Sequence, residues 1–183
     1  MEKIVKTRTF DLSQVKLNNT LTQVGLGITM LFAASQIYIP IQPVPITMQT
    51  VGVMLIALSL PYKAAMGSIL GYLGLAALGV PVLAQFSGGF ASLTGATAGY
   101  LVGFVYATHV MSRLRERFTS TSWNVAAICI IGQLCIYACG VAWLSRYFDS
   151  TQTALHFGFY PFILPGLVKA SILALATKHL IRK

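Results

Sequence analysis

Residues 79–104 read GVPVLAQFSGGFASLTGATAGYLVGF, a polar, glycine-rich half followed by an apolar half. Apolar stretches that fit membrane-spanning helices lie on both sides of it. A glycine-rich, non-helical segment between two spans must lie in water, or be buried where its backbone groups find partners. Its hydroxyl, amide and aromatic side chains suit a small-molecule pocket better than a plain connection. We therefore take this segment as the candidate binding site, with a simple extracellular loop as the alternative.

The composition predicts an integral membrane protein. Hydrophobic residues make up 56% of the chain and charged residues 9%, against about 25% charged residues in an ordinary soluble domain. Its apolar runs approach or exceed the roughly 20 residues that cross a bilayer as a helix. At 183 residues the chain has the length of one domain.

We predict an all-α protein with six transmembrane helices in a single domain, residues 21–183. Residues 1–20 are charged and polar and lack the apolar core of a secretory signal, so we expect a cytoplasmic tail there. The even number of spans puts both termini on one side. The expected spans are about Leu21–Ile39, Met48–Leu60, Ala64–Leu78, Ala98–Ser112, Trp123–Tyr147 and Phe159–Leu180.

The basic residues predict the orientation in the membrane. With both termini inside, eleven of the thirteen Lys and Arg residues lie on the cytoplasmic side, leaving Arg146 outside and Lys169 within the sixth span. This bias is typical of a multi-pass protein of the bacterial plasma membrane. A nucleic-acid surface is the rival explanation of the net charge of +9, but the charges are scattered over short loops and tails. The pattern favours topology, with the lipid bilayer as the surroundings and no nucleic-acid partner.

The first outer connection is rich in proline. Residues 39–50 read IPIQPVPITMQT, and each of Pro40, Pro43 and Pro45 fixes its own φ angle and biases the residue before it towards extended backbone. We interpret this stiff loop as a hinged cover over a binding site, with simple helix termination as the alternative. Its polar members include Thr47 and Gln49.

Three blocks together resemble a known family. IPIQPVPITMQT (39–50), GVPVLAQFSGG (79–89) and LTGATAGYLVGF (93–104) look like the BioY family, the biotin-specific substrate-capture (S) components of energy-coupling factor (ECF) vitamin transporters. The resemblance implies an ECF S-component-like fold, biotin as the ligand on the outer side, and a transmembrane T component with two ATPase subunits as partners. Some members are found without those partners, so the chain could work alone, as a homo-oligomer or in an ECF complex.

Lys169 is the most informative single residue. It lies in PFILPGLVKASILALA (161–176), where an ionisable group costs about 2.5–3.5 kcal/mol on insertion scales and is a functional candidate by default. A lysine that snorkels to the membrane interface is the alternative. The family typically has an Asp three residues before this Lys, both facing the biotin head group. This chain has Gly166 there.

The departure at Gly166 leaves two outcomes open. Another acceptor substitutes for the carboxylate, such as Gln85, Gln49 or a backbone carbonyl near Pro165, or the specificity is altered. Without an acidic neighbour, an anionic ligand group such as a carboxylate is the more attractive partner for Lys169, with the ureido oxygen as the alternative. The predicted substrate-binding residues are Lys169, Gln85, Tyr100, Gln49, Thr47, Ser87 and Gly88.

Two stripes of small residues suggest helix contacts. Gly95, Gly99 and Gly103 are spaced four apart and predict close approach of another helix. Gly25, Thr29 and Ala33 form a similar stripe on the first span. S components resembling this chain dock the T component through such a face, so we assign this stripe to partner docking, with packing inside the domain as the alternative.

The sequence favours a transporter over an enzyme. Cys129, Cys135 and Cys139 have no His or acidic residue nearby in the chain, which indicates buried thiols without a metal. We find no nucleophile–base pair, no cofactor motif and no phosphate-binding Walker loop, so any ATP would be hydrolysed by another chain. Biotin uptake is the leading hypothesis. An S component for a different small vitamin is the second, and a membrane-embedded enzyme the third.

Overall fold

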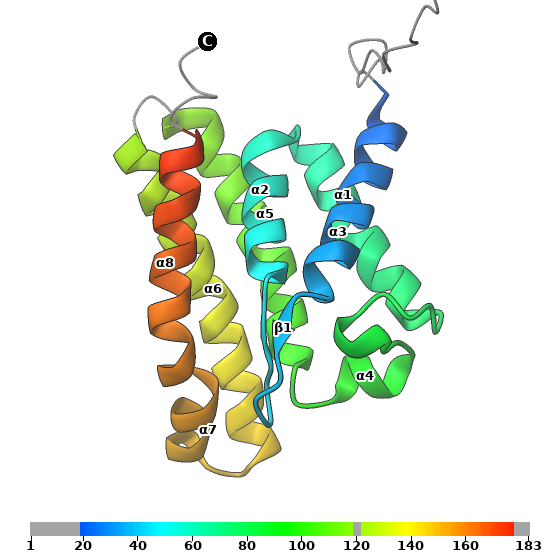
Figure 1. Cartoon of the computed structure of the whole chain (residues 1–183), viewed down its shortest axis with the longest axis vertical. Coiled ribbons are helices and arrows are strands. Elements are labelled where there is room, and N and C mark those ends of the chain that lie inside the picture. Colours follow the sequence, from blue (N-terminus) through cyan, green and yellow to red (C-terminus); the bar gives the residue numbers. More distant parts are fainter. Residues whose placement is uncertain (1–18, 119–121, 178–183) are drawn as a thin grey trace, which may run out of the picture.

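Six long helices form a bundle in the computed structural model, which describes residues 19–118 and 122–177 (Figure 1). The predicted cytoplasmic tail therefore lies almost wholly outside the described residues. The long helices are α1 (Thr20–Ser35), α2 (Gln49–Ser59), α3 (Tyr62–Ala77), α5 (Ala98–Phe118), α6 (Ser122–Tyr147) and α8 (Tyr160–Thr177). The short elements are strands β1 (Tyr38–Ile39) and β2 (Ile46–Thr47), the 3₁₀ helix η2 (Ala84–Phe86), and helices α4 (Phe90–Thr94) and α7 (Thr151–Gly158).

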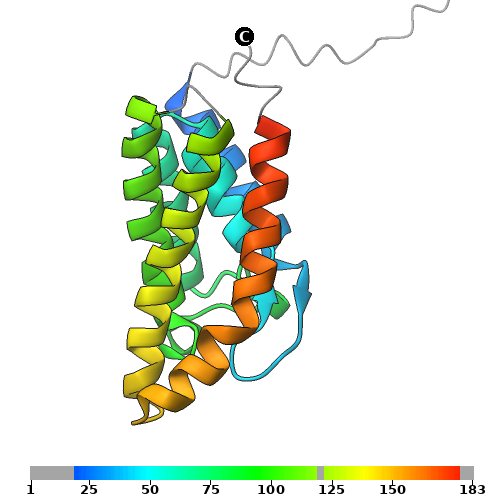
Figure 2. The same ribbon diagram turned by 90° about the vertical axis from the view of Figure 1, so that its left-hand side faces the viewer.

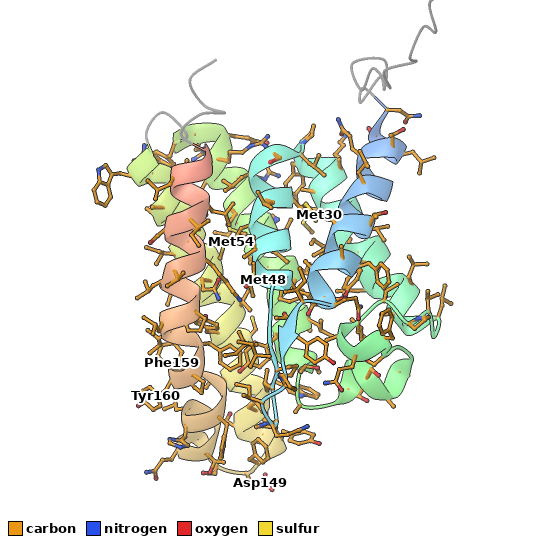
Figure 3. The ribbon with its side chains drawn as sticks, viewed as in Figure 1. Met30, Met48, Met54, Asp149, Phe159 and Tyr160 are labelled. Atoms are coloured by element: carbon orange, nitrogen blue, oxygen red, sulfur yellow. The ribbon has the colours of Figure 1, made fainter. Side chains whose placement is uncertain are left out.

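The bundle has two chemically different ends. The start of α1 and the end of α8 lie at one end, which we call the terminal end (Figure 1). The opposite end, which we call the loop end, carries α4, α7 and the tip of the β1–β2 hairpin (Figure 1). Asp149, between α6 and α7, also lies there (Figure 3). The described ends of the chain thus lie on one side, as an even number of spans predicts.

Glycines let α5 pack tightly against α6. A β-carbon on Gly99 would overlap the carbonyl oxygen of Cys139, and one on Gly103 would lie 2.8 Å from the Cα of Ile136. The prediction of a close helix contact is therefore confirmed at these two positions. Gly95 is not part of this helix face, because α5 begins at Ala98.

Three connections differ from the predicted spans. Helix α5 continues to Phe118, beyond the predicted end of the fourth span at Ser112. The first helix ends at Ser35 rather than Ile39, because Tyr38 and Ile39 pair in antiparallel register with Thr47 and Ile46 to form the hairpin. The connection 148–160 contains α7, whose first turn is capped by the Ser150 side chain accepting a hydrogen bond from the Thr153 amide. The predicted end of the sixth span at Leu180 lies beyond the described residues.

The outer surface of the bundle is strongly apolar. Two helical stretches, Trp123–Tyr147 and Thr151–Leu173, are long and apolar enough to cross a membrane by themselves, and Thr20–Ser35 and Gln49–Ser59 are apolar but shorter. Water-soluble monomers rarely expose apolar patches larger than a few hundred Å². Here large apolar side chains are exposed on five of the long helices, among them Leu26, Leu70, Val102, Ile130, Leu134 and Ile172.

Candidate functional site

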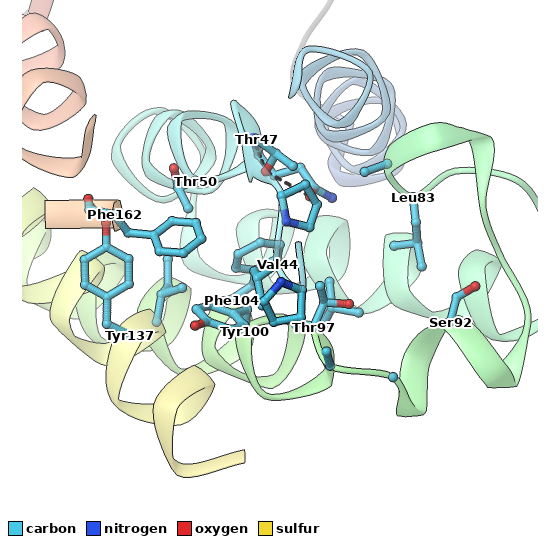
Figure 4. A pocket seen from close by; sticks show the side chains of 18 of the residues that line it. Val44, Thr47, Thr50, Leu83, Ser92, Thr97, Tyr100, Phe104, Tyr137 and Phe162 are labelled. Carbon is cyan, nitrogen blue, oxygen red and sulfur yellow. Dashed lines mark hydrogen bonds between the residues drawn. The ribbon is translucent and has the colours of Figure 1, made fainter. Parts of the chain in front are cut away.

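A cavity of about 310 Å³ lies in the half of the bundle nearer the loop end. The hairpin, the glycine-rich segment and helices α2, α5, α6 and α8 all contribute to its wall. Tyr137 and Phe162 lie at one end of the cavity, and Leu83 and Ser92 lie at the other (Figure 4). Its apolar wall includes Val44, Leu101, Phe104, Ile136 and Phe162.

Lys169 reaches this cavity from α8. Its Nζ atom donates hydrogen bonds to the Thr47 carbonyl oxygen at 2.6 Å and to the Thr50 hydroxyl at 3.2 Å. The ammonium group thereby ties α8 to the hairpin, which lies beside it (Figure 2). Lys169 forms no ion pair with Glu116 or Asp149, the acidic residues in the described part of the chain. A cation held only by neutral oxygen atoms is available to a polar or anionic ligand group.

Gln49 connects the hairpin to the glycine-rich segment through a chain of hydrogen bonds. The Thr47 hydroxyl donates to Gln49 Oε1 at 3.1 Å, and Gln49 Nε2 donates to the Tyr72 hydroxyl at 2.7 Å. The Tyr72 hydroxyl in turn donates a hydrogen bond to the carbonyl oxygen of Val82, at 2.8 Å. Both ends of the Gln49 amide are therefore engaged. Gln49 and Thr47 line the cavity, but Gln49 acts mainly as a positioning residue for the hairpin and the glycine-rich segment.

The end of α1 holds the glycine-rich segment in place. The Ser35 hydroxyl donates to the carbonyl oxygen of Val82 at 2.9 Å, and Gln36 Nε2 donates to that of Leu83 at 3.0 Å. Next to these anchors, Gln85 adopts a positive φ of 60°, a conformation uncommon outside glycine that clusters at ligand sites. Gln85 lines the cavity and is exposed, which leaves its amide accessible at the rim.

The remaining predicted residues divide into lining and structural positions. The Tyr100 ring lines the cavity, but its hydroxyl donates to the Gly158 carbonyl oxygen at 2.7 Å and so serves the α5–α7 contact. Ser87 lines the cavity, and its hydroxyl bonds to the backbone of its own turn. Gly88 is not among the lining residues. A β-carbon there would overlap the Val80 carbonyl oxygen, so glycine permits this close backbone approach.

Two polar residues of α6 at the site escaped the sequence analysis. Gln133 and Tyr137 line the cavity one helical turn apart, and Gln133 Nε2 donates to the Tyr137 hydroxyl at 2.6 Å. Tyr137 in turn donates to the Phe162 carbonyl oxygen at 2.6 Å. A β-carbon on Gly166 would lie 2.5 Å from the Tyr137 hydroxyl oxygen. An amide in the middle of an apolar span was the signal that could have revealed Gln133.

The predicted docking stripe faces away from the bundle. Gly25, Thr29 and Ala33 are exposed on α1, and a β-carbon on Gly25 would have no neighbour within 4 Å. The residues of α1 that are buried in the bundle are Gly27, Leu31 and Ser35. Packing inside the domain, the alternative explanation of the stripe, therefore uses a different face of this helix.

Comparison with known sequences connects this site to a transporter family. The profile of the BioY family matches residues 6–183. The probable biotin transporter BioY of Rickettsia prowazekii is 38% identical over 152 residues, which cover 83% of this chain and 78% of that protein. The biotin transporter BioY of Thermotoga maritima is 36% identical over 163 residues, covering 87% of this chain and 96% of that protein.

The fold has a counterpart among solved structures. The crystal structure of the S-component for biotin from an ECF-type ABC transporter superposes with a TM-score of 0.79 at 25% sequence identity. The superposition covers 90% of this chain and 91% of that one. The predicted ECF S-component-like fold is thereby confirmed. With a family profile that spans almost its whole length and a matching fold, this chain belongs to the BioY family.

Proposed function

We propose that this chain takes up biotin across the membrane and binds the vitamin in the cavity beneath the hairpin. One observation carries the proposal: in a chain of the BioY family, a pocket presents the partly buried ammonium group of Lys169 beside an apolar wall. A volume of about 310 Å³ lies at the lower end of the range for ligand pockets, roughly 300–1,000 Å³, which fits a small vitamin.

The chemistry of the cavity complements the chemistry of biotin. Biotin carries a ureido ring that both donates and accepts hydrogen bonds, an apolar thioether ring and chain, and a terminal carboxylate. The aromatic and aliphatic wall suits the apolar parts. Lys169 supplies a cation, and Gln85 supplies an exposed amide at the rim. Lys169 therefore contacts the ligand directly, and Gln85 contacts whichever polar group lies towards the glycine-rich segment.

Equilibrium binding of radiolabelled biotin to the purified chain in detergent tests this function. We expect saturable binding that unlabelled biotin displaces and that excess thiamine or riboflavin leaves unchanged. A second candidate, capture of a different small vitamin, is favoured by Gly166, because the family usually has a carboxylate at this position for the ureido N–H groups. Binding of biotin in the micromolar range or weaker, with displacement by another vitamin, would favour that candidate over ours.

We further propose that both termini are cytoplasmic and that the exposed stripe on α1 docks an ECF T component, whose two ATPase subunits supply the energy. Ala33→Leu adds bulk to the stripe and should reduce biotin uptake by cells that express the ECF partners, while biotin binding to the purified chain stays unchanged. Ala142→Leu on α6 is the matched control, because Ala142 is also an exposed alanine. Equal uptake by both variants would exclude docking through this stripe.

A further inference from the structure

Gln133 carries a buried oxygen atom without a hydrogen-bond partner. Gln133 lines the cavity, and only 6% of the residue is exposed. Within residues 19–118 and 122–177, Gln133 Oε1 and the Thr108 hydroxyl are the buried side-chain polar atoms that lack a partner. Buried polar groups are nearly always paired, so each exception calls for a physical reason.

The hydrogen-bond network determines which end of the Gln133 amide is unpaired. The Tyr137 hydroxyl has one proton, and it donates that proton to the Phe162 carbonyl oxygen. Towards Gln133 the Tyr137 oxygen can then only accept, so the group beside it must be the Gln133 amino group. The opposite end of the amide is therefore the carbonyl oxygen. The Gln133 carbonyl oxygen therefore needs a hydrogen-bond donor as its partner.

Gly166 lets the Gln133 side chain pack closely against α8, one helical turn before Lys169. A β-carbon on Gly166 would lie 3.4 Å from Gln133 Cγ and Nε2 and 2.5 Å from the Tyr137 hydroxyl, so glycine is what lets the α6 pair approach α8. Lys169 follows Gly166 by about one helical turn and also lines the cavity. The residues that line this cavity thus include a strong donor, Lys169, and the residue that carries the unpaired acceptor, Gln133. A cyclic urea presents the complementary pair, a carbonyl oxygen flanked by N–H groups.

We propose that Gln133 Oε1 accepts a hydrogen bond from a ureido N–H group of biotin while Lys169 donates to the ureido oxygen. This inference rests on the proposed biotin function and makes Gln133 a specificity-determining residue. It replaces the acceptors expected from the sequence, because the Gln49 amide is engaged at both ends and Gln85 lies at the exposed rim. The ureido ring then lies at the α6–α8 end of the cavity, with the carboxylate towards the glycine-rich segment at the other end.

Gln133→Met tests the proposal, because methionine keeps the length of the side chain and removes the acceptor, together with the amino group that donates to Tyr137. Leaving a donor of the ligand unpaired in a buried site should weaken biotin binding by about 5- to 150-fold. The parent should also bind biotin far more tightly than a biotin analogue methylated on both ureido nitrogens, and Gln133→Met should narrow that difference. The readouts are the dissociation constants of both ligands for both proteins.

Thr108→Val is the matched control. It also removes a buried oxygen without a partner among the described residues, but Thr108 is not part of the cavity wall. Both variants should remain folded, with Gln133→Met somewhat less stable because it also loses the hydrogen bond to Tyr137, and only Gln133→Met should lose affinity for biotin. A folded Gln133→Met protein that binds biotin as tightly as the parent would overturn the proposal and leave the biotin function standing. A parent that fails to bind biotin would overturn both.

Discussion

At the scale of single residues, the site depends on how one cation is accommodated inside an apolar helix bundle. An ionised lysine is costly in such surroundings unless it is hydrogen-bonded. Lys169 meets this requirement through the Thr47 carbonyl oxygen and the Thr50 hydroxyl, both on the cover side of the cavity. Neither oxygen atom carries a negative charge. A ligand group with high electron density is therefore the best additional partner for the ammonium group.

Lys169→Met should weaken biotin binding by about 10- to 150-fold, because a hydrogen bond to a charged group contributes roughly 1.5–3 kcal/mol. Lys169→Arg should also lose affinity, since a planar guanidinium does not reproduce a compact ammonium group. Titration of purified variants with biotin measures the effect. Lys63→Met, at an exposed lysine near the terminal end, is the control. A folded Lys169→Met protein with parental affinity would make Lys169 a purely structural residue.

A functional residue can be recognised in a sequence when its charge or polarity differs sharply from that of its neighbours. This explains which site residues could be predicted. Lys169 is a charge in an apolar run, so its place in the site could be anticipated. Gln133 is neutral and lies in a long apolar helix, where no periodic pattern shows which face meets a cavity. Its role depends on Tyr137 and Gly166, and the contact between α6 and α8 that joins them is visible only in three dimensions.

At the scale of elements, the hairpin takes the place of half a transmembrane helix. Helix α2 has 11 residues and is about 17 Å long, against a hydrocarbon core of about 30 Å. The hairpin completes this path towards the loop end (Figure 1). Non-helical backbone is tolerated at membrane depth where it lines a cavity or is buried in protein, and Pro43, Val44 and Pro45 do line the cavity. This arrangement explains why the second predicted span, Met48–Leu60, is too short to cross the membrane by itself.

Biotin should slow amide hydrogen exchange in the hairpin. A ligand beneath residues 38–47 and in contact with Lys169 would stabilise the closed position of the hairpin. The hydrogen bond from Lys169 to the Thr47 carbonyl oxygen already favours this position. Exchange measured by mass spectrometry with and without saturating biotin tests this prediction. The α2–α3 turn near Pro61, at the terminal end, serves as the internal reference. Equal exchange of the hairpin in both conditions would show that it is not a cover.

Gly103→Ala should lower the thermal stability of the protein. The added methyl group would lie 2.8 Å from Ile136 Cα, so α5 and α6 must move apart, and overpacking of this kind typically costs about 1–3 kcal/mol. Gly74→Ala is the control, because a β-carbon there has no neighbour within 4 Å and alanine favours a helix by about 1 kcal/mol over glycine. Equal melting temperatures for the two variants in detergent would contradict the tight α5–α6 packing.

At the scale of the whole molecule, the two ends of the bundle differ in charge and in shape. Lys63, Arg113, Arg115 and Arg117 lie near the terminal end, where α3 begins and α5 finishes, whereas Arg146 lies in the last turn of α6. The cavity and its cover lie towards the opposite end. A bundle with this charge bias is expected to place its terminal end in the cytoplasm, which would put the cavity nearer the outside, where we propose that biotin is captured.

Labelling of single cysteines from outside the cell tests this orientation. In a background with Cys129, Cys135 and Cys139 replaced by serine, Asp149→Cys should react with a membrane-impermeant maleimide in intact cells. Arg117→Cys should react only after the cells are opened. Arg117 is preferable to Arg115, which donates a hydrogen bond to the Leu58 carbonyl oxygen. The reverse labelling pattern would invert the topology and place the cavity on the cytoplasmic side.

The central claim is that biotin binds in the cavity lined by the hairpin, the glycine-rich segment and helices α2, α5, α6 and α8. A structure of the chain determined with saturating biotin measures this most directly. We predict biotin within that cavity, its ureido ring in hydrogen-bonding distance of Lys169 Nζ and Gln133 Oε1. An empty cavity at saturation, or biotin bound on the lipid-facing surface between α6 and α8, would contradict the account.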